Sequence, residues 1–222
     1  MYSIAIDGPA GAGKSTIAKK VAEGLGFIYV DTGAMYRAMA LYFLRHGIGA
    51  EDEEAIAAAC PKVEVSITYV DGEQQVLLNG ENVNGLRRTE EVSRMTSASS
   101  KYPVVRKKLV ELQQELAKKE NVIMDGRDIG TCVLPDATAK IYLTASVSER
   151  ARRRYVEQQE RGTICTLEDI AKDIEARDYQ DMNREFAPLK QAEDAVLVDS
   201  SHMNIDQVTE RITEIFHKAI GE

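Results

Sequence analysis

The sequence predicts an α/β fold in which helices cover both faces of an open, parallel β-sheet. Five short apolar runs alternate with longer segments of helical character, and they lie at residues 2–7, 27–30, 121–124, 139–143 and 195–198. In the last helical segment, 205–220, apolar residues recur at the spacing of one helix face. Such alternation is typical of parallel sheets, because each crossover helix covers one face of the sheet.

The segments that follow the first two runs have clear helix signals. The first run ends at a glycine-rich loop, and good helix formers follow over 14–25. The second run is followed by Asp31 and Thr32, which offer cap chemistry to a helix over about 34–45. Gly47 is the expected end of that helix.

One region, 61–88, departs from the alternation of strands and helices. Apolar and polar residues alternate over 63–69, and Asp71 with the glycine after it turns the chain into a second short strand. These features predict a small antiparallel β insert in a core made of 1–60 and 89–222. The alternative is an extension of the edge of the main sheet.

Composition excludes several classes of partner. The 28 basic and 36 acidic residues of the 222-residue chain give a net charge of −8, which argues against general attraction to nucleic acid or to an anionic membrane. No apolar run approaches the roughly 20 residues of a membrane-spanning helix, and the glycine loop comes too early for a signal peptide. We expect a cytoplasmic protein, and a monomer because no apolar helix face stands out as spare.

The strongest local signal is a glycine-rich phosphate loop. The motif G-x-x-x-x-G-K-[ST] is matched without a gap by Gly8, Pro9, Ala10, Gly11, Ala12, Gly13, Lys14 and Ser15. The loop stands between a predicted strand and a predicted helix, which is the context that the motif requires. Backbone N–H groups and the positive helix end favour a phosphate there. We therefore predict that 8–16 bind ATP.

Three side chains of the loop have separate expected roles. Lys14 is expected to reach the β and γ phosphates and to act in catalysis, Ser15 to bind Mg²⁺, and Thr16 to bond a phosphate oxygen. The loop alone leaves kinases, motor-type ATPases and switch GTPases open. A guanine-binding N-K-x-D element is absent, because the sequence contains no Asn-Lys pair. A small-molecule kinase would need a second anion site and a cationic lid.

Candidate acceptor groups follow the second and third predicted strands, where open parallel sheets bind their ligands. Arg37 and Arg127 are expected to bind one acceptor phosphate, because a planar guanidinium group can bind two phosphate oxygens. Arg127 is also a candidate catalytic residue. Thr32 either caps a helix or contacts the ligand, and the two roles are compatible. Asp125 could hold a magnesium-bound water, and Asp128 could accept a hydrogen bond from an amine on a base.

An arginine-rich segment, about 148–165, is predicted to form a helical lid over the polyphosphate. Its arginines are Arg150, Arg152, Arg153, Arg154 and Arg161. Arg150 and Arg154 share a helix face at i and i+4, and they are candidate catalytic residues that neutralise the transferred phosphoryl group. The alternative is a solvated helix face whose arginines pair with glutamates.

A second charged stretch carries Arg177, Asp181 and Arg184 at spacings of four and three, which place them on one helix face. One carboxylate between two guanidinium groups can bind a sugar hydroxyl beside a phosphate. The alternative is a chain of ion pairs within the helix, and the spacing alone does not separate the two.

Taken together, four segments of the chain resemble bacterial cytidylate kinases, which are nucleoside monophosphate kinases. The segments are D-G-P-A-G-A-G-K-S-T, V-D-T-G-A-M-Y-R, D-G-R-D-I-G-T and A-R-D-Y-Q-D-M-N-R-E-F-A-P-L. The likeness covers nearly the whole chain, including 61–88. It implies a P-loop NTPase-type core of five parallel strands that transfers the terminal phosphoryl group of ATP to CMP or dCMP.

The resemblance also implies roles for individual residues. The acceptor-phosphate ligands would be Arg37, Arg127 and Arg184. The residues that contact cytosine would be Thr32, Ser97, Arg106 and Asp128. The ribose contacts would be Arg177 and Asp181. Only the resemblance selects Ser97 and Arg106, since nothing in their local pattern does.

Two other functions stay open at this point. The first is a kinase with a different acceptor, such as UMP, AMP or a small hydroxyl metabolite. The second is a protein that binds ATP without turnover. A panel of acceptors separates all three hypotheses.

Overall fold

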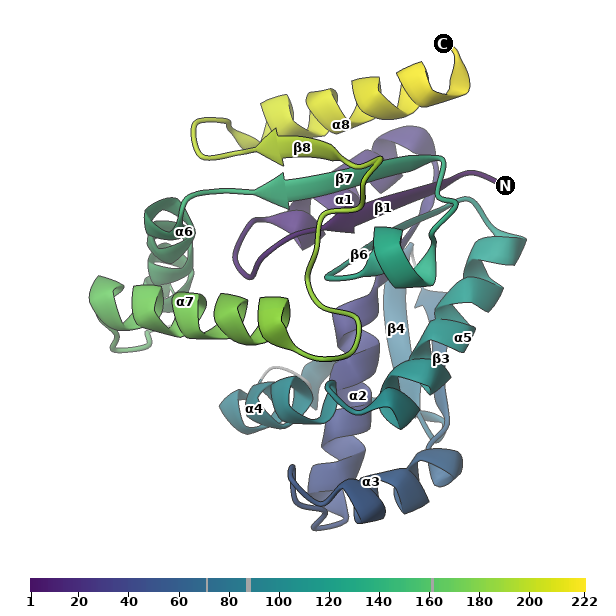
Figure 1. Cartoon of the computed structure of the whole chain (residues 1–222), viewed down its shortest axis with the longest axis vertical. Helices are drawn as coiled ribbons and strands as arrows, with labels where there is room; N and C mark the ends of the chain where they lie inside the picture. Colours follow the sequence, from purple (N-terminus) through teal and green to yellow (C-terminus); the bar gives the residue numbers. More distant parts are fainter. Residues whose placement is uncertain (71, 87–88, 161) are drawn as a thin grey trace. The chain divides into compact units, whose positions relative to one another are not determined.

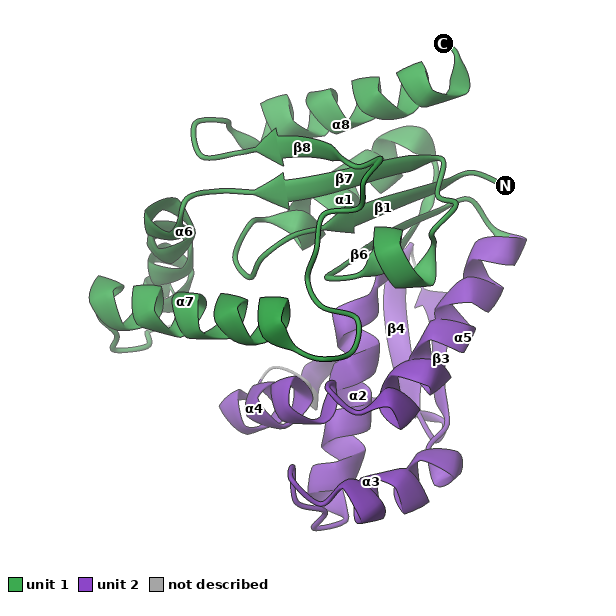
Figure 2. Cartoon of the chain, in the orientation of Figure 1, with its two compact units in different colours: residues 1–29, 120–222 green, residues 30–119 purple. Residues whose placement is uncertain are grey.

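The structure is a computed structural model that describes residues 1–70, 72–86, 89–160 and 162–222. Three expectations fall outside the described residues: the turn at Asp71, the end of the predicted insert at 87–88, and the lid residue Arg161. The chain divides into two compact units, coloured separately in Figure 2: unit 1 comprises 1–29 and 120–222, and unit 2 comprises 30–119. Among the described helices, none combines the length and apolar composition needed to cross a membrane.

Unit 1 holds most of a five-stranded sheet. The strands of this sheet are β1 (Ser3–Asp7), β2 (Ile28–Asp31), β6 (Val122–Gly126), β7 (Ala139–Thr144) and β8 (Val196–Asp199). The strand order is β2-β6-β1-β7-β8. Strand β1 pairs in parallel with β6 and β7, and β7 pairs in parallel with β8. The predicted open parallel sheet is confirmed.

Helices α1 (Lys14–Leu25) and α8 (Ile205–Ile220) pack together and bury their apolar faces in the core of unit 1. Figure 1 shows α8 running alongside β8. The ring of Phe216 lies edge-on to that of Phe27, with 5.3 Å between the centroids. Asn204 begins α8 with a complete capping box, which satisfies backbone donors at the helix start.

Helices α6 (Val147–Glu160) and α7 (Leu167–Asn183) pack on each other through a small core of their own. Its buried members are Ala151, Ile170 and Ile174. In Figure 1 both helices lie beyond the carboxyl ends of β7 and β8, and α6 follows β7 directly. The predicted lid segment therefore contains a helix that is half of a two-helix unit.

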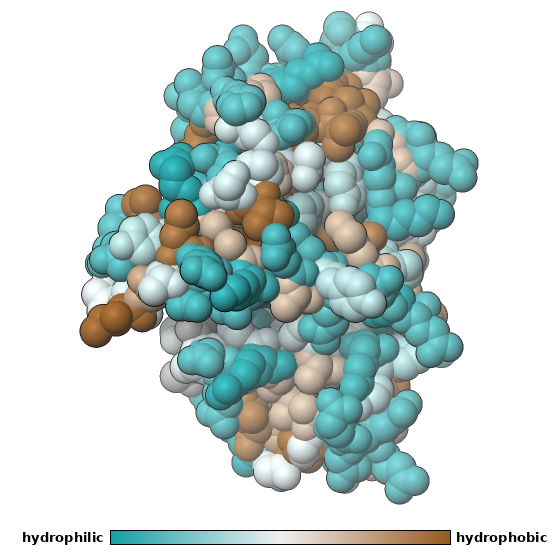
Figure 3. All heavy atoms as spheres, turned by 60° about the vertical axis from the view of Figure 1, so that its left-hand side comes forward, coloured by the Kyte–Doolittle hydropathy of each residue, from teal (hydrophilic) through white to brown (hydrophobic). Residues whose placement is uncertain are grey.

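On the face presented in Figure 3, hydrophobic side chains form separate patches between hydrophilic ones.

The described residues of unit 2 form four helices and a small antiparallel sheet. The helices are α2 (Thr32–Arg45), α3 (Glu53–Ala59), α4 (Glu90–Ser99) and α5 (Pro103–Lys119), with short turns η1 (Cys60–Lys62) and η2 (Asn84–Leu86). The sheet has the order β3-β4-β5, made by β3 (Val65–Val70), β4 (Glu73–Leu78) and β5 (Glu81–Asn82). It is separate from the five-stranded sheet. The predicted antiparallel sheet is thus confirmed, and it does not extend the main sheet.

Candidate active site

The phosphate loop leaves β1 at Gly8 and ends where α1 begins at Lys14. Gly8 has a φ of 150°, and a Cβ atom there would lie 1.9 Å from the carbonyl oxygen of Leu143. Gly13, the N-cap of α1, has a left-handed φ of 89°. Both positions need glycine, because side chains rarely adopt such φ values and the space beside Gly8 is already filled. The loop therefore places backbone N–H groups at a helix N-terminus, which is an anion-binding arrangement.

The ammonium group of Lys14 bonds to its own loop. Its Nζ donates to the carbonyl oxygens of Gly8 at 2.8 Å and Pro9 at 2.7 Å, and the residue is only 6% exposed. Burial lowers the pKa of Lys14 well below its usual value, and the positive charge of Arg127 lowers this pKa further. A bound polyanion would offset both effects, so the electrostatics favour a phosphate ligand here.

Ser15, Asp125 and Tyr29 form a hydrogen-bonded group beside the loop. The Ser15 hydroxyl donates to Asp125 Oδ2 at 2.9 Å, and the Tyr29 hydroxyl donates to Asp125 Oδ1 at 2.8 Å. Asp125 is 6% exposed. A hydroxyl and a carboxylate are the oxygen ligands that Mg²⁺ prefers, and phosphate-bound Mg²⁺ needs few protein ligands. That donor set fits Mg²⁺, although the described residues contain no group of three or more His, Cys, Asp or Glu side chains able to hold a metal.

Asp7, at the end of β1, anchors the segment that follows β6. Its two carboxylate oxygens accept backbone N–H groups from Ile129 and Gly130, both at 2.7 Å. Burial raises the pKa of Asp7 to about 6, although the two amide hydrogen bonds act against this rise. These bonds fix the start of the π-helical turn η3 (Ile129–Val133), directly after Arg127 and Asp128.

Beside this turn lies an arginine cluster, which we define as Arg127, Asp128, Asp181 and Arg184. Arg127 Nε donates to Asp181 Oδ2 at 2.7 Å. Arg184 approaches Asp128 at 3.4 Å and Asp181 at 3.9 Å. Burial would raise the pKa of Asp181, but the guanidinium groups of Arg127, Arg177 and Arg184 outweigh it and lower that pKa. Asp181 therefore bonds across to Arg127 as well as lying near Arg184.

The predicted lid arginines divide into buried and exposed members. Arg150 is 4% exposed and pairs with Asp178, with 2.6 Å between Nη1 and Oδ2. Arg154 is exposed and lies 3.4 Å from Glu157. This pair is of the kind expected for a solvated helix face whose arginines pair with glutamates. Arg152 and Arg153 both bond to Glu149. The catalytic roles of Arg150 and Arg154 stay predictions.

In unit 2, α2 carries two predicted acceptor ligands. The helix is capped by Asp31, whose Oδ1 accepts the Ala34 N–H at 2.8 Å, and Thr32 is the buried first residue of the helix. Arg37 Nη2 bonds to Asp31 Oδ2 at 2.8 Å. The Nε of Arg37 is buried and has no hydrogen-bond partner among the described residues. Asp31 therefore both caps α2 and holds the guanidinium group of Arg37.

The two residues selected by resemblance alone also lie in unit 2. Arg106, on α5, is 2% exposed, and its Nη1 donates to the Ser100 carbonyl at 3.4 Å. Its guanidinium carbon lies 5.5 Å from the centroid of the Tyr36 ring, a cation–π distance. Ser97 is half-buried on α4, a helix that packs against α2.

The structure thus gathers the predicted residues into two sets. The set in unit 1 is the phosphate loop, Asp125, Arg127, Asp128, Arg150, Arg177, Asp181 and Arg184. The set in unit 2 is Thr32, Arg37, Ser97 and Arg106. That Arg37 and Arg127 bind one phosphate stays a prediction, because these two residues belong to different units.

Three residues of unit 1 hold this site together and were missed by the sequence reasoning: Asp7, Tyr29 and Asp178. Asp7 offers a signal, since it is a carboxylate that ends a buried strand directly before the glycine loop. Asp178 follows the predicted ligand Arg177, but its partner Arg150 lies on another helix. Tyr29 sits inside an apolar run, where its hydroxyl attracts no notice.

Solved structures support the fold. An uncharacterized protein from Eubacterium ventriosum aligns with a TM-score of 0.55 and 13% identity, over 97% of this chain and 98% of that one. A shikimate kinase from Bacteroides thetaiotaomicron aligns with a TM-score of 0.50 and 12% identity, over 97% and 98% of the two chains. At these identities the similarity concerns the fold alone. It agrees with the predicted P-loop NTPase-type architecture.

Sequence comparison is far more specific. A cytidylate kinase from Caldicellulosiruptor saccharolyticus is 50% identical over 219 residues, which cover 99% of this chain and 97% of the relative. A cytidylate kinase from Lactobacillus gasseri is 50% identical over 218 residues, or 98% and 95% of the two chains. The family model described as cytidylate kinase matches residues 4–218. The chain belongs to the cytidylate kinase family.

Proposed function

We propose that this chain transfers the γ-phosphoryl group of ATP to CMP or dCMP, which gives ADP and CDP or dCDP. The observation that carries the proposal is 50% identity, over 99% of the chain, to a protein named cytidylate kinase. The phosphate loop of unit 1, with the buried Lys14 at its end, supports ATP as the phosphoryl donor.

The phosphate loop binds the donor. Its backbone N–H groups and the N-terminus of α1 face the β and γ phosphates, and Lys14 exchanges the carbonyls of Gly8 and Pro9 for phosphate oxygens. The exchange is favourable because burial and Arg127 disfavour the charged ammonium group until an anion arrives. Thr16 adds a hydroxyl donor to a phosphate oxygen.

Mg²⁺ would be held by the Ser15 hydroxyl oxygen and, through a water molecule, by Asp125. When bound, it neutralises negative charge on the β and γ phosphates. The Tyr29 hydroxyl keeps one carboxylate oxygen of Asp125 engaged, so the other oxygen faces Ser15.

Arg37, Arg127 and Arg184 bind the acceptor phosphate. An oxygen of this phosphate attacks the γ-phosphorus, and the bond from that phosphorus to the β–γ bridging oxygen breaks, which releases ADP. Because the acceptor is already anionic, proton transfer contributes little, and catalysis rests on positioning and charge neutralisation. Arg150 and Arg154 of the lid would stabilise charge on the transferred group.

The nucleoside of the acceptor would be recognised by polar side chains. Thr32, Ser97, Arg106 and Asp128 contact the cytosine, and Arg177 with Asp181 contacts the ribose. A carboxylate such as Asp128 can accept a hydrogen bond from the exocyclic amine of cytosine, which uracil lacks. Discrimination against UMP follows from that difference.

The test is ADP release with ATP and Mg²⁺ in the presence of CMP, dCMP, UMP, AMP or a small hydroxyl metabolite. We expect turnover with CMP and dCMP to exceed turnover with the other acceptors. Sustained failure with CMP and dCMP, in protein shown to be folded, would remove the proposal. Size-exclusion chromatography of the same preparation checks the expected monomer.

A further inference from the structure

Two buried charged side chains bond to the backbone of a single phosphate-loop residue. Arg150 Nη1 donates to the carbonyl oxygen of Ala10 at 2.9 Å, and Asp178 Oδ1 accepts the N–H of Ala10 at 3.3 Å. The same Arg150 Nη1 lies 2.6 Å from Asp178 Oδ2. Both peptide groups that flank the Cα atom of Ala10 are therefore held by one ion pair, which we call the Arg150–Asp178 pair.

Arg150 is itself held from two other directions. Its Nε donates to the carbonyl oxygen of Ala145 at 2.9 Å, just before α6 begins. A Cβ atom on Gly11, whose φ is 75°, would lie 3.4 Å from the Cβ atom of Arg150. The arginine stem thus packs directly on the loop. Its position is fixed by the base of α6 and by the loop backbone together.

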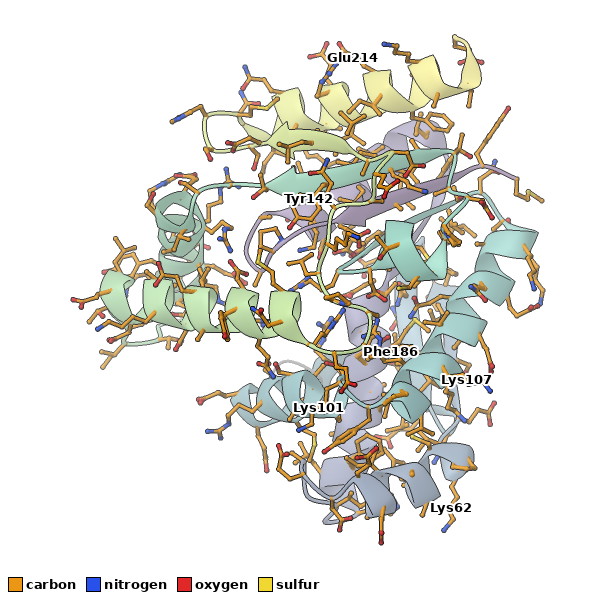
Figure 4. All side chains as sticks on the ribbon, viewed as in Figure 1. Lys62, Lys101, Lys107, Tyr142, Phe186 and Glu214 are labelled. Atoms are coloured by element: carbon orange, nitrogen blue, oxygen red, sulfur yellow. The ribbon has the colours of Figure 1, made fainter. Side chains whose placement is uncertain are left out.

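Asp178 is placed by the α6–α7 core. Ile170, Ile174 and Asp178 follow one another at intervals of four, so they share one face of α7, and all three are buried. Tyr142 of β7, labelled in Figure 4, lies close enough for Asp178 to raise the pKa of its phenol, after burial as the larger cause. The face that joins α7 to α6 therefore ends in a carboxylate at the phosphate loop.

We propose that Asp178 is a positioning residue for ATP binding, acting on Ala10 both directly and through Arg150. The inference rests on the proposed function, in which the phosphate loop binds ATP. A glycine-rich loop has many accessible conformations, and each must be given up when phosphate binds. The Arg150–Asp178 pair fixes the peptides of Ala10 beforehand, which lowers the entropic cost of binding.

A purely structural role makes a different prediction. If the Arg150–Asp178 pair only joined α6 to α7, its loss would lower the thermal midpoint and leave the ATP affinity of the folded protein unchanged. If it positions the loop, ATP affinity falls while CMP affinity does not. The ratio of the two affinities therefore separates the roles.

The first experiment measures the Kd of ATP and the Kd of CMP, each alone, by calorimetry. We expect Asp178→Ala to weaken ATP binding about 10-fold and Asp178→Asn, which keeps an acceptor for the Ala10 N–H, about 3-fold. The Kd of CMP should stay within about 2-fold of wild type. Asp173→Asn is the matched control, since it makes the same change at an exposed position of α7 and should alter neither constant. Unchanged or tighter ATP binding by both Asp178 variants overturns the inference.

A second set of variants keeps the test valid if single substitutions impair folding. Replacing both partners of a buried ion pair with apolar residues is often tolerated, so Arg150→Met with Asp178→Leu should fold. If the Arg150–Asp178 pair positions the loop, this double variant should bind ATP about 10-fold more weakly than wild type, while its Kd for CMP stays within about 2-fold. A folded double variant that binds ATP as tightly as wild type overturns the inference.

The two proposals fail in distinguishable ways. If the wild type binds ATP, the Asp178 variants bind ATP more weakly and the wild type does not phosphorylate CMP, the proposed function is contradicted and the role of Asp178 is supported. If the wild type phosphorylates CMP and the Asp178 variants bind ATP as tightly as the wild type, the proposed function is supported and the role of Asp178 is contradicted. Absence of ATP binding by the wild type contradicts both.

Discussion

At the end of β1, Asp7 lies among backbone amides, whereas near the end of α7 Asp181 lies among arginine side chains. Asp7 accepts two amide hydrogen bonds, yet burial dominates and raises its pKa to about 6. Burial acts on Asp181 in the same direction, but three guanidinium groups outweigh it and lower the pKa of Asp181. The pKa values of two mostly buried carboxylates in the same unit are thus shifted in opposite directions.

The phosphate loop and the arginine cluster of unit 1 differ in what fixes their geometry. Around the phosphate loop, geometry comes from the backbone: glycine φ values, amide donors and the close approach of Gly8 to Leu143. In the arginine cluster, geometry comes from side-chain charge, as the bond between Arg127 and Asp181 shows. Changes in the loop should therefore affect every acceptor or the fold, whereas a change at Asp128 of the cluster should affect the choice of acceptor.

Lys14→Ala should have the largest effect on activity. It removes the loop cation that neutralises the donor phosphates, so we expect kcat/KM to fall about 10³-fold for every acceptor. Steady-state kinetics with CMP, dCMP and UMP measure this. Lys20→Ala is the control, because Lys20 lies on the same helix but forms an exposed pair with Asp206. A loss confined to one acceptor would contradict the assignment of the loop to the donor.

Gly8→Ala should cost the most stability. The new Cβ atom would lie 1.9 Å from the Leu143 carbonyl oxygen at a φ of 150°, so strand β7 or the loop must move. We expect the free energy of unfolding to fall by about 4 kcal/mol, measured in urea. Gly24→Ala is the control: apart from its chain neighbours and the backbone of its own helix, no atom lies within 4 Å of its Cβ position. Helix propensity should stabilise this variant by about 0.5 kcal/mol. Equal effects at the two glycines would show that the close approach to β7 is not required.

The sequence predicts the phosphate loop more completely than it predicts the arginine cluster. The phosphate loop is a contiguous motif with fixed spacing between a strand and a helix, so its residues and its conformation follow from local chemistry. The alternation of short apolar runs and helices likewise predicts the parallel sheet, because each crossover helix covers one face of the sheet. Local pattern alone was sufficient for both features.

Contacts between distant segments could not be predicted in that way. The spacing places Arg150 on one face of a charged helix. Whether Arg150 is solvated depends on its partner Asp178, which lies on another helix and belongs to no recognisable motif. Asp7 bonds to amides more than 120 residues away. Ser97 and Arg106 came from resemblance alone, since their roles depend on the ligand and not on their neighbours in the chain.

Stability should also respond to pH through Asp7. Its pKa is raised from 3.8 to about 6 in the folded protein, so the folded state binds the extra proton and stability falls as pH rises between these values. The shift corresponds to about 3 kcal/mol over that range. Urea unfolding of wild type and Asp7→Asn at pH 4 to 6.5 measures it, and the variant should lack this part of the slope. Parallel curves for the two proteins would contradict the raised pKa.

Asp181→Asn tests the opposite direction in the arginine cluster. Because the pKa of Asp181 is lowered, its contribution is present above the unfolded pKa and is lost as pH falls through the folded pKa. The wild type should therefore lose more stability than the variant on acidification below about pH 4. If Asp7→Asn and Asp181→Asn shifted the pH profile in the same direction, the contrast between amide and guanidinium surroundings would be wrong.

Asp128→Ala should have the smallest effect and the narrowest one. Asp128 is 5% exposed and lies near Arg184, and the proposed bond to the cytosine amine is a single contact with a neutral donor. We expect the ratio of kcat/KM for CMP over UMP to fall about 10-fold, mainly through loss of CMP turnover. Competition between CMP and UMP in one reaction measures the ratio directly. A uniform loss for both acceptors, like that expected of Lys14→Ala, would place Asp128 with the general phosphate-binding groups, and the arginine cluster would then not contribute to base selection.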